Sequence, residues 1–391
     1  MNLFEVLYKD NQRRCPSCLK LLYPGDCEIV STEDSAEGPA GTVLKPAPNP
    51  GSLRSFRARN DPEPLTGERY VTTGARRKCY HCSYLLPYNI DRTRSLTIAI
   101  VGENTSGKSI YISAIIKQLS EGRLVRQDQY TTFRCLTPDV REYYLDNYLR
   151  PLFEYKQVLQ PNQPSTETTH KPLIYELTTR IEKYRPARSV NLIIYDTSGE
   201  DYMVQGRMIR FAPYVLNADA IIYLADPVSM QEIASYLPPH LQYKTAPARN
   251  PTEGLNNIMQ LVEQYYGKTA GASLSKLPLA ITLPKADLLK YVTPVSQQFS
   301  FMKPKIYAGG IDLKDIHNVD QEVRHLLREY GDRTLLQAIP GTSKTRFFAT
   351  SATGYAPDEH GNLPAVEPHR CLDPILWVLY ELKLLQEEYT P

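Results

Sequence analysis

Large apolar residues are distributed unevenly along the chain. From Ser95 onward, short apolar runs alternate with segments of helical periodicity, a pattern typical of a mostly parallel sheet with crossover helices. Residues 31–75 are instead rich in Pro, Gly, Ser, Thr and charged residues, so a flexible insertion is expected there. The pattern predicts a large α/β domain over residues 95–391 and a small N-terminal module over residues 1–94, which the insertion interrupts.

Six apolar runs are predicted to be strands: residues 95–101, 172–180, 190–196, 218–225, 278–283 and 346–351. The second and third runs are joined only by a short polar link, residues 182–186, which is too short for a helical crossover. They should therefore form an antiparallel hairpin. The expected architecture is a three-layer α/β fold with a mostly parallel six-stranded sheet and one antiparallel edge strand.

A helical insertion is expected over about residues 122–170, because this connection is far longer than usual. Within it, Thr137 can cap a helix that extends to Leu159, and Pro151 should kink or restart that helix. The helix carries an apolar stripe rich in tyrosine: Val140, Tyr144, Leu145, Tyr148, Leu149 and Leu152. The stripe either packs on the core or forms a surface for a protein partner, since tyrosine combines apolar area with a polar tip.

Composition and charge exclude several classes of function. The 391 residues carry 45 basic and 43 acidic side chains, a formal net charge of +2, so no overall field favours nucleic acid or an anionic membrane. No apolar run reaches the roughly 18 residues of a membrane span, and Met1–Arg14 lacks the features of a secretory signal. We therefore expect a cytoplasmic protein that binds neither membranes nor nucleic acid.

The strongest chemical signal is the segment Gly-Glu-Asn-Thr-Ser-Gly-Lys-Ser at residues 102–109, between the first strand and a helix expected over Ile110–Leu119. This is a phosphate-binding loop, in which backbone N–H groups surround the phosphates. Lys108 is expected to reach the β- and γ-phosphates and Ser109 to bind Mg²⁺. The predicted contacts are Gly102, Glu103, Asn104, Thr105, Ser106, Gly107, Lys108, Ser109 and Ile110.

A second element supports the first, because the strand at residues 190–196 ends in an acid. Ligands of parallel sheets bind at the carboxyl ends of the strands, so Asp196 can hold Mg²⁺ through water. Gly199, three residues later, can bring its backbone N–H against the γ-phosphate.

Two further motifs point to a base. Lys285-Ala-Asp287 resembles the guanine-recognition motif Asn-Lys-x-Asp, in which the aspartate accepts two hydrogen bonds from guanine and the lysine stem lies along the base. Pro284 occupies the asparagine position, so the amide that ties this motif to the phosphate loop is missing. Ser351-Ala352 resembles the Ser-Ala-Lys loop that contacts guanine O6 through a backbone N–H, with Thr353 in place of lysine.

The four motifs occur in the same order as in the Ras-like class of P-loop GTPases, which residues 95–388 resemble. The resemblance implies a switch threonine that completes the Mg²⁺ shell, for which Thr166 is the first candidate and Thr168 the second. Many members of the class orient the attacking water with a glutamine, where this chain has Glu200. A carboxylate cannot donate to phosphate oxygens and adds negative charge, so slow hydrolysis is expected. The expected catalytic residues are Lys108, Glu200 and Thr166.

Four of the seven cysteines form two Cys-x-x-Cys pairs, Cys15 with Cys18 and Cys79 with Cys82. Four thiolates fit a closed structural Zn²⁺ site, with redox use of the pairs as the alternative. Cys27 or His81 can substitute for one ligand. A zinc ribbon followed by a Ras-like domain resembles bacterial proteins of the double-GTPase type.

These features favour a GTP-binding switch protein, a slow Mg²⁺-dependent GTPase whose zinc ribbon and tyrosine-rich insertion dock protein partners. One alternative is an adaptor or scaffold that binds nucleotide with little or no hydrolysis. Another is a P-loop ATPase, suggested by the departures at Pro284 and Thr353. Self-association is compatible with each of these functions.

Overall fold

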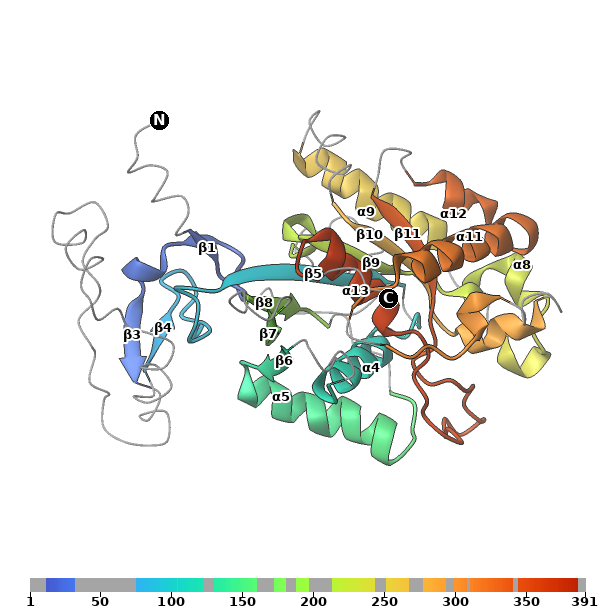
Figure 1. Ribbon diagram of the computed structural model, residues 1–391, viewed down its shortest axis with the longest axis horizontal. Coiled ribbons are helices and arrows are strands. Elements are labelled where there is room, and N and C mark those ends of the chain that lie inside the picture. The colour runs from blue at the N-terminus through green and yellow to red at the C-terminus, as the bar shows by residue number, and fades with distance from the viewer. Residues whose placement is uncertain are drawn as a thin grey trace.

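The computed structural model describes residues 12–31, 75–103, 105–122, 130–159, 172–180, 188–196, 213–242, 251–266, 277–292, 299–307, 310–339 and 344–385. A central twisted sheet has helices on both faces, and a small N-terminal unit lies at one end of the long strand β5 (Figure 1). None of the described helices combines the length and the apolar character that a membrane crossing requires.

The central sheet has seven described strands in the order β11-β10-β9-β5-β8-β7-β6. Their bounds are β5 Arg94–Gly102, β6 Tyr130–Cys135, β7 Leu173–Arg180, β8 Arg188–Ile194, β9 Ala220–Leu224, β10 Leu279–Leu283 and β11 Thr345–Ala349. The five strands from β11 to β8 are parallel, and β7 pairs antiparallel with β8, as the short link predicts. The α/β class and the six predicted strands are therefore confirmed.

The predicted strand count was one too low. The seventh strand, β6, pairs antiparallel with β7, so the edge of the sheet is β6 and the antiparallel strand β7 is internal. Within β6 the ring of Phe133 stacks on Tyr175 of β7, with the ring centroids 4.3 Å apart. The sequence Tyr-Thr-Thr-Phe-Arg-Cys has little apolar alternation of its own, and cross-strand contacts of this kind stabilise such strands.

Two hydrophobic cores fill the spaces between the sheet and its helices. One face carries α9 Pro251–Tyr266, α11 Leu313–Tyr330 and α12 Arg333–Gln337. The other face carries α4 Lys108–Ser120, α13 Leu372–Glu381 and the helical insertion. Helix α11 begins where the carboxylate of Asp312 accepts a hydrogen bond from the Asp315 backbone N–H at 2.9 Å, and it buries Val319 and Val323 against the sheet.

Shorter helical segments connect these elements. They are η1 Pro24–Asp26, η4 Val215–Asn217, η5 Pro227–Ser229, α8 Gln231–Ala234, η6 Pro239–Leu241, η8 Ala286–Tyr291 and η10 Ser300–Met302.

The helical insertion consists of α5 Pro138–Tyr144 followed directly by the π-helix η3 Leu145–Glu154. The expected restart at Pro151 was wrong, because Pro151 lies inside the π-helix and the pitch changes at Leu145 instead. Thr137 occupies the N-cap position, but its side chain makes no capping bond. Its hydroxyl accepts from the Ile174 backbone N–H at 3.4 Å, and this ties the helix start to β7.

The tyrosine-rich stripe of the insertion packs on the core. Tyr144 and Leu152 are buried, and Tyr148 and Leu149 are half-buried against the same cluster. This supports the core alternative for the stripe. Two tyrosines of the insertion are exposed instead: Tyr143, with 59% of its surface accessible, and Tyr155, with 64%.

The N-terminal unit contains two small antiparallel ribbons. Strands β1 Arg13–Arg14 and β2 Leu21–Leu22 form the first, and β3 Glu28–Ser31 and β4 Ala75–Lys78 form the second. The unit contacts the sheet through the Tyr195 hydroxyl, which donates to the Pro16 carbonyl oxygen at 2.6 Å.

Candidate nucleotide and metal sites

The predicted phosphate loop lies between the end of β5 and the start of α4, and its glycines have separate physical roles. A Cβ at Gly102 would lie 2.7 Å from the carbonyl oxygen of Leu224, so no larger residue fits there. Gly107 has φ +81° at the N-cap of α4, in the left-handed region that favours glycine. The loop therefore closes tightly against β9 and turns sharply into the helix.

Lys108 lies across the loop and is almost completely buried. Its Nζ donates to the carbonyl oxygens of Gly102 at 3.0 Å and Glu103 at 2.7 Å. The Ser106 hydroxyl donates to the Glu103 carbonyl oxygen at 2.8 Å. The loop backbone by itself therefore holds the ammonium group in place.

Ser109, in the first turn of α4, lies beside Asp196, which follows β8. The Ser109 hydroxyl donates to Asp196 Oδ1 at 2.9 Å. A hydroxyl and a carboxylate beside a phosphate loop are the oxygen donors that Mg²⁺ prefers, so the donor set fits this ion. The predicted residues Asn104, Thr166, Thr168, Gly199 and Glu200 lie outside the described part of the chain.

The predicted base-recognition residues are held by one another. The Ser351 hydroxyl donates to Asp287 Oδ1 at 2.7 Å and accepts from the Gly354 backbone N–H at 2.8 Å. Lys285 has φ +58° and donates from Nζ to the Thr105 carbonyl oxygen at 3.0 Å. The asparagine amide is absent at Pro284, as the sequence predicts, and Lys285 connects this motif to the phosphate loop instead.

The two halves of the site line one cavity of about 780 Å³, a volume typical of ligand pockets. The phosphate loop contributes Thr105–Ile110, and the base side contributes Lys285, Asp287, Ser351 and Ala352. Gly102 and Glu103 are not among the lining residues. Glu103 is buried beside the turn that follows β9, where its Oε2 contacts the Ser229 hydroxyl.

Sequence reasoning missed another part of the cavity wall. Residues 157–159, at the end of the helical insertion, and residues 355–361, after β11, line it together. The Val158 backbone N–H donates to the Gly361 carbonyl oxygen at 2.9 Å and so joins the two segments. Pro357, Asp358 and Gly361 are the turn signals in the sequence at this point, and Gly361 takes the left-handed conformation, with φ +81°.

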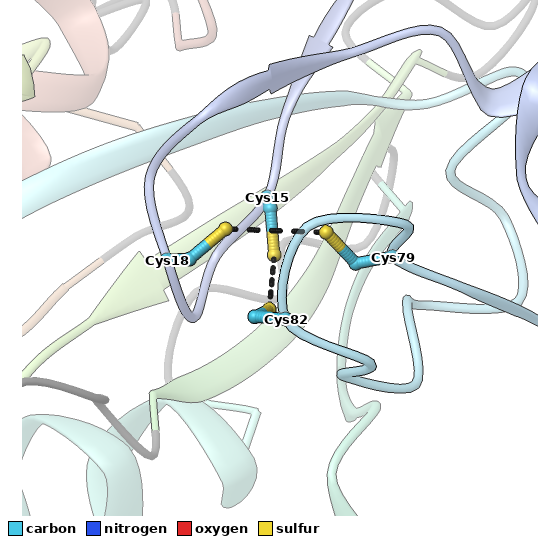
Figure 2. A group of neighbouring side chains, drawn as sticks. All are labelled: Cys15, Cys18, Cys79 and Cys82. Atoms are coloured by element: carbon cyan, nitrogen blue, oxygen red, sulfur yellow. Dashed lines mark hydrogen bonds between the residues drawn. The ribbon is translucent and has the colours of Figure 1, made fainter.

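The four predicted zinc ligands form one cluster (Figure 2). The Sγ atoms of Cys15 and Cys82 lie 3.7 Å apart, those of Cys18 and Cys79 lie 3.9 Å apart, and all four lie within 4.8 Å of one another. A tetrahedral Zn²⁺ with bonds of about 2.3 Å requires sulfur separations of about 3.8 Å, so the cluster fits this ion. Cys27 lies outside the cluster, as does the other alternative ligand, His81.

Burial of the cluster bears on its chemistry. It raises the pKa of Cys18 to about 11 and also raises the pKa of Cys15. The thiols of Cys15 and Cys18 therefore stay protonated at neutral pH unless a cation stabilises the thiolate, as coordination to Zn²⁺ does. Burial opposes ionisation of Cys82 too, but hydrogen bonds from the Tyr84 backbone and the other thiols outweigh it, so the pKa of Cys82 is lowered instead. The spacing of the four sulfurs favours a bound metal over use of the pairs as reactive thiols.

Comparison with known proteins agrees with this geometry. The family model described as Double-GTPase 2 matches residues 96–327, more than half of the chain. The chain is also similar to a Mycolicibacterium smegmatis protein, SaeC, whose name gives it a proposed role in ESX-1 scaffolding and assembly. The two are 24% identical over an alignment of 404 positions, which covers 93% of this chain and 98% of the relative.

Proposed function

Because the chain belongs to the Double-GTPase 2 family, we propose that it is a guanine-nucleotide-binding protein and a slow Mg²⁺-dependent GTPase that docks protein partners. One observation carries this proposal. The phosphate loop, the Lys285-x-Asp287 motif and the Ser351-Ala352 loop, which lie far apart in the sequence, line the same cavity. A cavity with phosphate-binding geometry at one end and base-recognition residues at the other has the chemistry of a nucleotide site.

At the base end, Asp287 is the proposed guanine receptor. Ser351 holds its Oδ1, and this fixes the carboxylate plane against the cavity. A carboxylate so held accepts from the two donors on the Watson–Crick edge of guanine, whereas adenine presents a mismatched edge. The backbone N–H groups of Ser351-Ala352 are proposed to meet guanine O6.

At the phosphate end, Lys108 and the loop backbone are proposed to hold the β- and γ-phosphates. Ser109 and Asp196 are proposed to hold Mg²⁺, with Thr166 completing the set, and Gly199 is proposed to contact the γ-phosphate. Mg²⁺, when bound, neutralises charge on the phosphate oxygens. Glu200 is proposed to accept from the attacking water. A carboxylate adds negative charge beside a polyanion, so hydrolysis without a partner is slow.

The base assignment is tested by calorimetric titration with GDP, GTP and ATP, together with identification of any nucleotide released when the fresh protein is denatured. We expect guanine nucleotide to be released and to bind more tightly than ATP. Asp287→Asn should weaken GTP binding by about tenfold to a hundredfold and leave ATP binding unchanged. Asp312→Asn, which changes a helix-capping carboxylate outside the cavity lining, is the matched control. Tighter binding of ATP than of GTP by the wild type would favour the ATPase alternative.

The second proposed function is a nucleotide-binding scaffold with little or no hydrolysis. The scaffolding role in the name of the M. smegmatis relative favours it. Single-turnover measurement of phosphate release separates the two. A rate of phosphate release that falls in Glu200→Ala and differs from the wild-type rate in Glu200→Gln supports the GTPase. If the wild type releases no phosphate even with partner proteins, the scaffold is supported.

The cysteine cluster is proposed to hold a structural Zn²⁺ and to support the docking module. Metal analysis of the purified protein should find about one zinc per chain, and Cys18→Ser together with Cys82→Ser should remove it. Cys135→Ser is the matched control, because Cys135 lies in β6 outside the cluster. A protein that purifies without zinc and keeps its folded N-terminal unit would contradict the proposal.

A further inference from the structure

The turn that follows β9, residues 226–229, connects the two halves of the cavity. Asp226 is completely buried, and its Oδ1 accepts from the Val228 backbone N–H at 3.0 Å. Its Oδ2 accepts from Lys285 Nζ at 2.7 Å, and the same ammonium group donates to the Thr105 carbonyl oxygen. Asp226 therefore orients the lysine that joins the base-recognition motif to the phosphate loop.

Ser229 makes a second connection from the same turn. Its Oγ lies 3.1 Å from Glu103 Oε2 and 2.8 Å from the Asp226 carbonyl oxygen. A serine hydroxyl has one proton, so it cannot donate to both oxygens at once. Both contacts become hydrogen bonds when Glu103 is protonated, because its O–H then donates to Ser229 Oγ while Ser229 donates to the carbonyl oxygen.

The surroundings of Glu103 favour the same protonation state. Its Oε1 is buried and has no hydrogen-bond partner among the described residues, a costly position for half of an ionised carboxylate. The pKa of Glu103 is raised to about 8, chiefly by burial; the charge of Asp226 acts in the same direction, and the hydrogen bond with Ser229 and the charge of Lys108 oppose the rise. The carboxylate of Glu253 and the phenol of Tyr223 also face it.

We propose that Asp226 and protonated Glu103 are positioning residues that couple the phosphate loop to the base-recognition motif through the turn at residues 226–229. They replace the asparagine amide that Pro284 removes. This inference rests on the proposed guanine-nucleotide function. Neither side chain lines the cavity, so both act through Lys285 and the loop backbone.

The first test measures dissociation of a fluorescent GDP analogue from the full-length protein. Asp226→Asn keeps the size of the side chain, but its amide presents N–H groups or a neutral oxygen to Lys285. We expect dissociation to accelerate by about tenfold, since a charge-assisted hydrogen bond is lost. Ser229→Ala, which removes only a hydroxyl, should accelerate it by a smaller factor.

The matched control is Asp332→Asn. Asp332 is also buried and accepts from a backbone N–H, that of Thr334 at 2.8 Å, at the start of a short helix outside the cavity lining. Its substitution should lower the melting temperature and leave GDP dissociation at the wild-type rate. Equal acceleration in the two variants, or wild-type dissociation in folded Asp226→Asn, would overturn the proposal.

The second test is a pH profile of GDP dissociation. When Glu103 ionises, its charge lies beside Asp226 and competes with phosphate for Lys108, so dissociation of the wild type should accelerate above about pH 8. Glu103→Gln keeps a donor toward Ser229 without the charge, so it should match the wild type at about pH 7 and lose the acceleration. Glu103→Ala should be fast at every pH. Persistence of the acceleration in Glu103→Gln would remove Glu103 from the coupling.

Calorimetry and GDP dissociation distinguish loss of the proposed nucleotide binding from loss of the coupling alone. If the wild type binds no guanine nucleotide in calorimetry, the proposed function fails, and the coupling that rests on it fails with it. If the wild type binds GDP and the Asp226, Ser229 and Glu103 variants behave as wild type, only the coupling fails.

Discussion

The proposed phosphate half and the proposed base half of the cavity are built in different ways. The phosphate half is one continuous segment, residues 102–109, whose shape follows from two glycines and from bonds within the loop. The base half is assembled from Asp226, Lys285-x-Asp287 and Ser351–Gly354, which come from three different strand ends. The geometry of a continuous segment is set by its own residues, whereas the geometry of a site built from several segments depends on the contacts between them.

A buried ion network supports the assembled half. The Ser351 and His369 backbones exchange hydrogen bonds of 3.0 and 2.7 Å, which join the base loop to the segment before α13. The next residue, Arg370, is buried, has φ +53° and pairs with Asp373 at 3.0 Å and with Asp315 of α11. The loop that contains Ser351 is therefore anchored to two helices.

The largest expected effect is on the base half. Arg370→Met leaves the buried Asp373 carboxylate without its cationic partner, so the free energy of unfolding should fall by about 3–5 kcal/mol. Denaturant unfolding measures this. Arg150→Met, which breaks an exposed ion pair with Asp146, should cost less than about 1 kcal/mol. Equal losses in the two variants would show that the network does not anchor the loop.

Substitutions in the two halves should also separate affinity from selectivity. Lys108→Ala removes a charged donor from the phosphates and should weaken GTP and ATP equally, by about a hundredfold. The Asp287→Asn variant proposed above loses affinity for guanine alone. Calorimetry with both nucleotides measures the ratio. A change in base preference in Lys108→Ala would mean that the halves are not energetically separate.

A pH-dependent effect concerns the stability of the connection between the halves. Folding raises the pKa of Glu103 to about 8, so the native protein binds a proton that the unfolded chain releases nearer pH 4.5. The contribution of Glu103 to stability is therefore greatest below about pH 4.5 and declines until about pH 8. Subtracting the unfolding free energy of Glu103→Gln from that of the wild type at each pH should reveal this decline, and a flat difference would contradict it.

Much of the fold could be predicted because local patterns of apolar residues and short connections indicate it. The apolar runs predict β5, β7, β8, β9, β10 and β11, and the short link predicts the antiparallel pair β7–β8. Strand β6 could not be predicted in this way, since its stability comes from pairing with β7 and from the Phe133–Tyr175 stack. The π-helical pitch of residues 145–154 was likewise not predicted from the apolar stripe, which indicates only that one face of the helix is buried.

The residues of the two sites likewise fall into those that the sequence indicates and those that only the fold brings together. The spacing of Gly102, Gly107 and Lys108, and of the two Cys-x-x-Cys pairs, is visible in the sequence, because backbone and ligand geometry require those residues at those intervals. The roles of Glu103, Asp226, Ser229 and Arg370 are not visible there, since each depends on a partner brought close only by the fold.

The amino-acid sequence by itself therefore determined a phosphate loop, a four-cysteine cluster and a parallel α/β sheet. All three follow from short-range periodicity and from the fixed geometry of glycine turns and thiolate pairs. Only the tertiary structure decided how the base side is held where Pro284 removes the expected amide. The free energy of a buried charge or hydrogen bond depends on neighbours distant in the chain, and Lys285 has its partner Asp226 59 residues earlier.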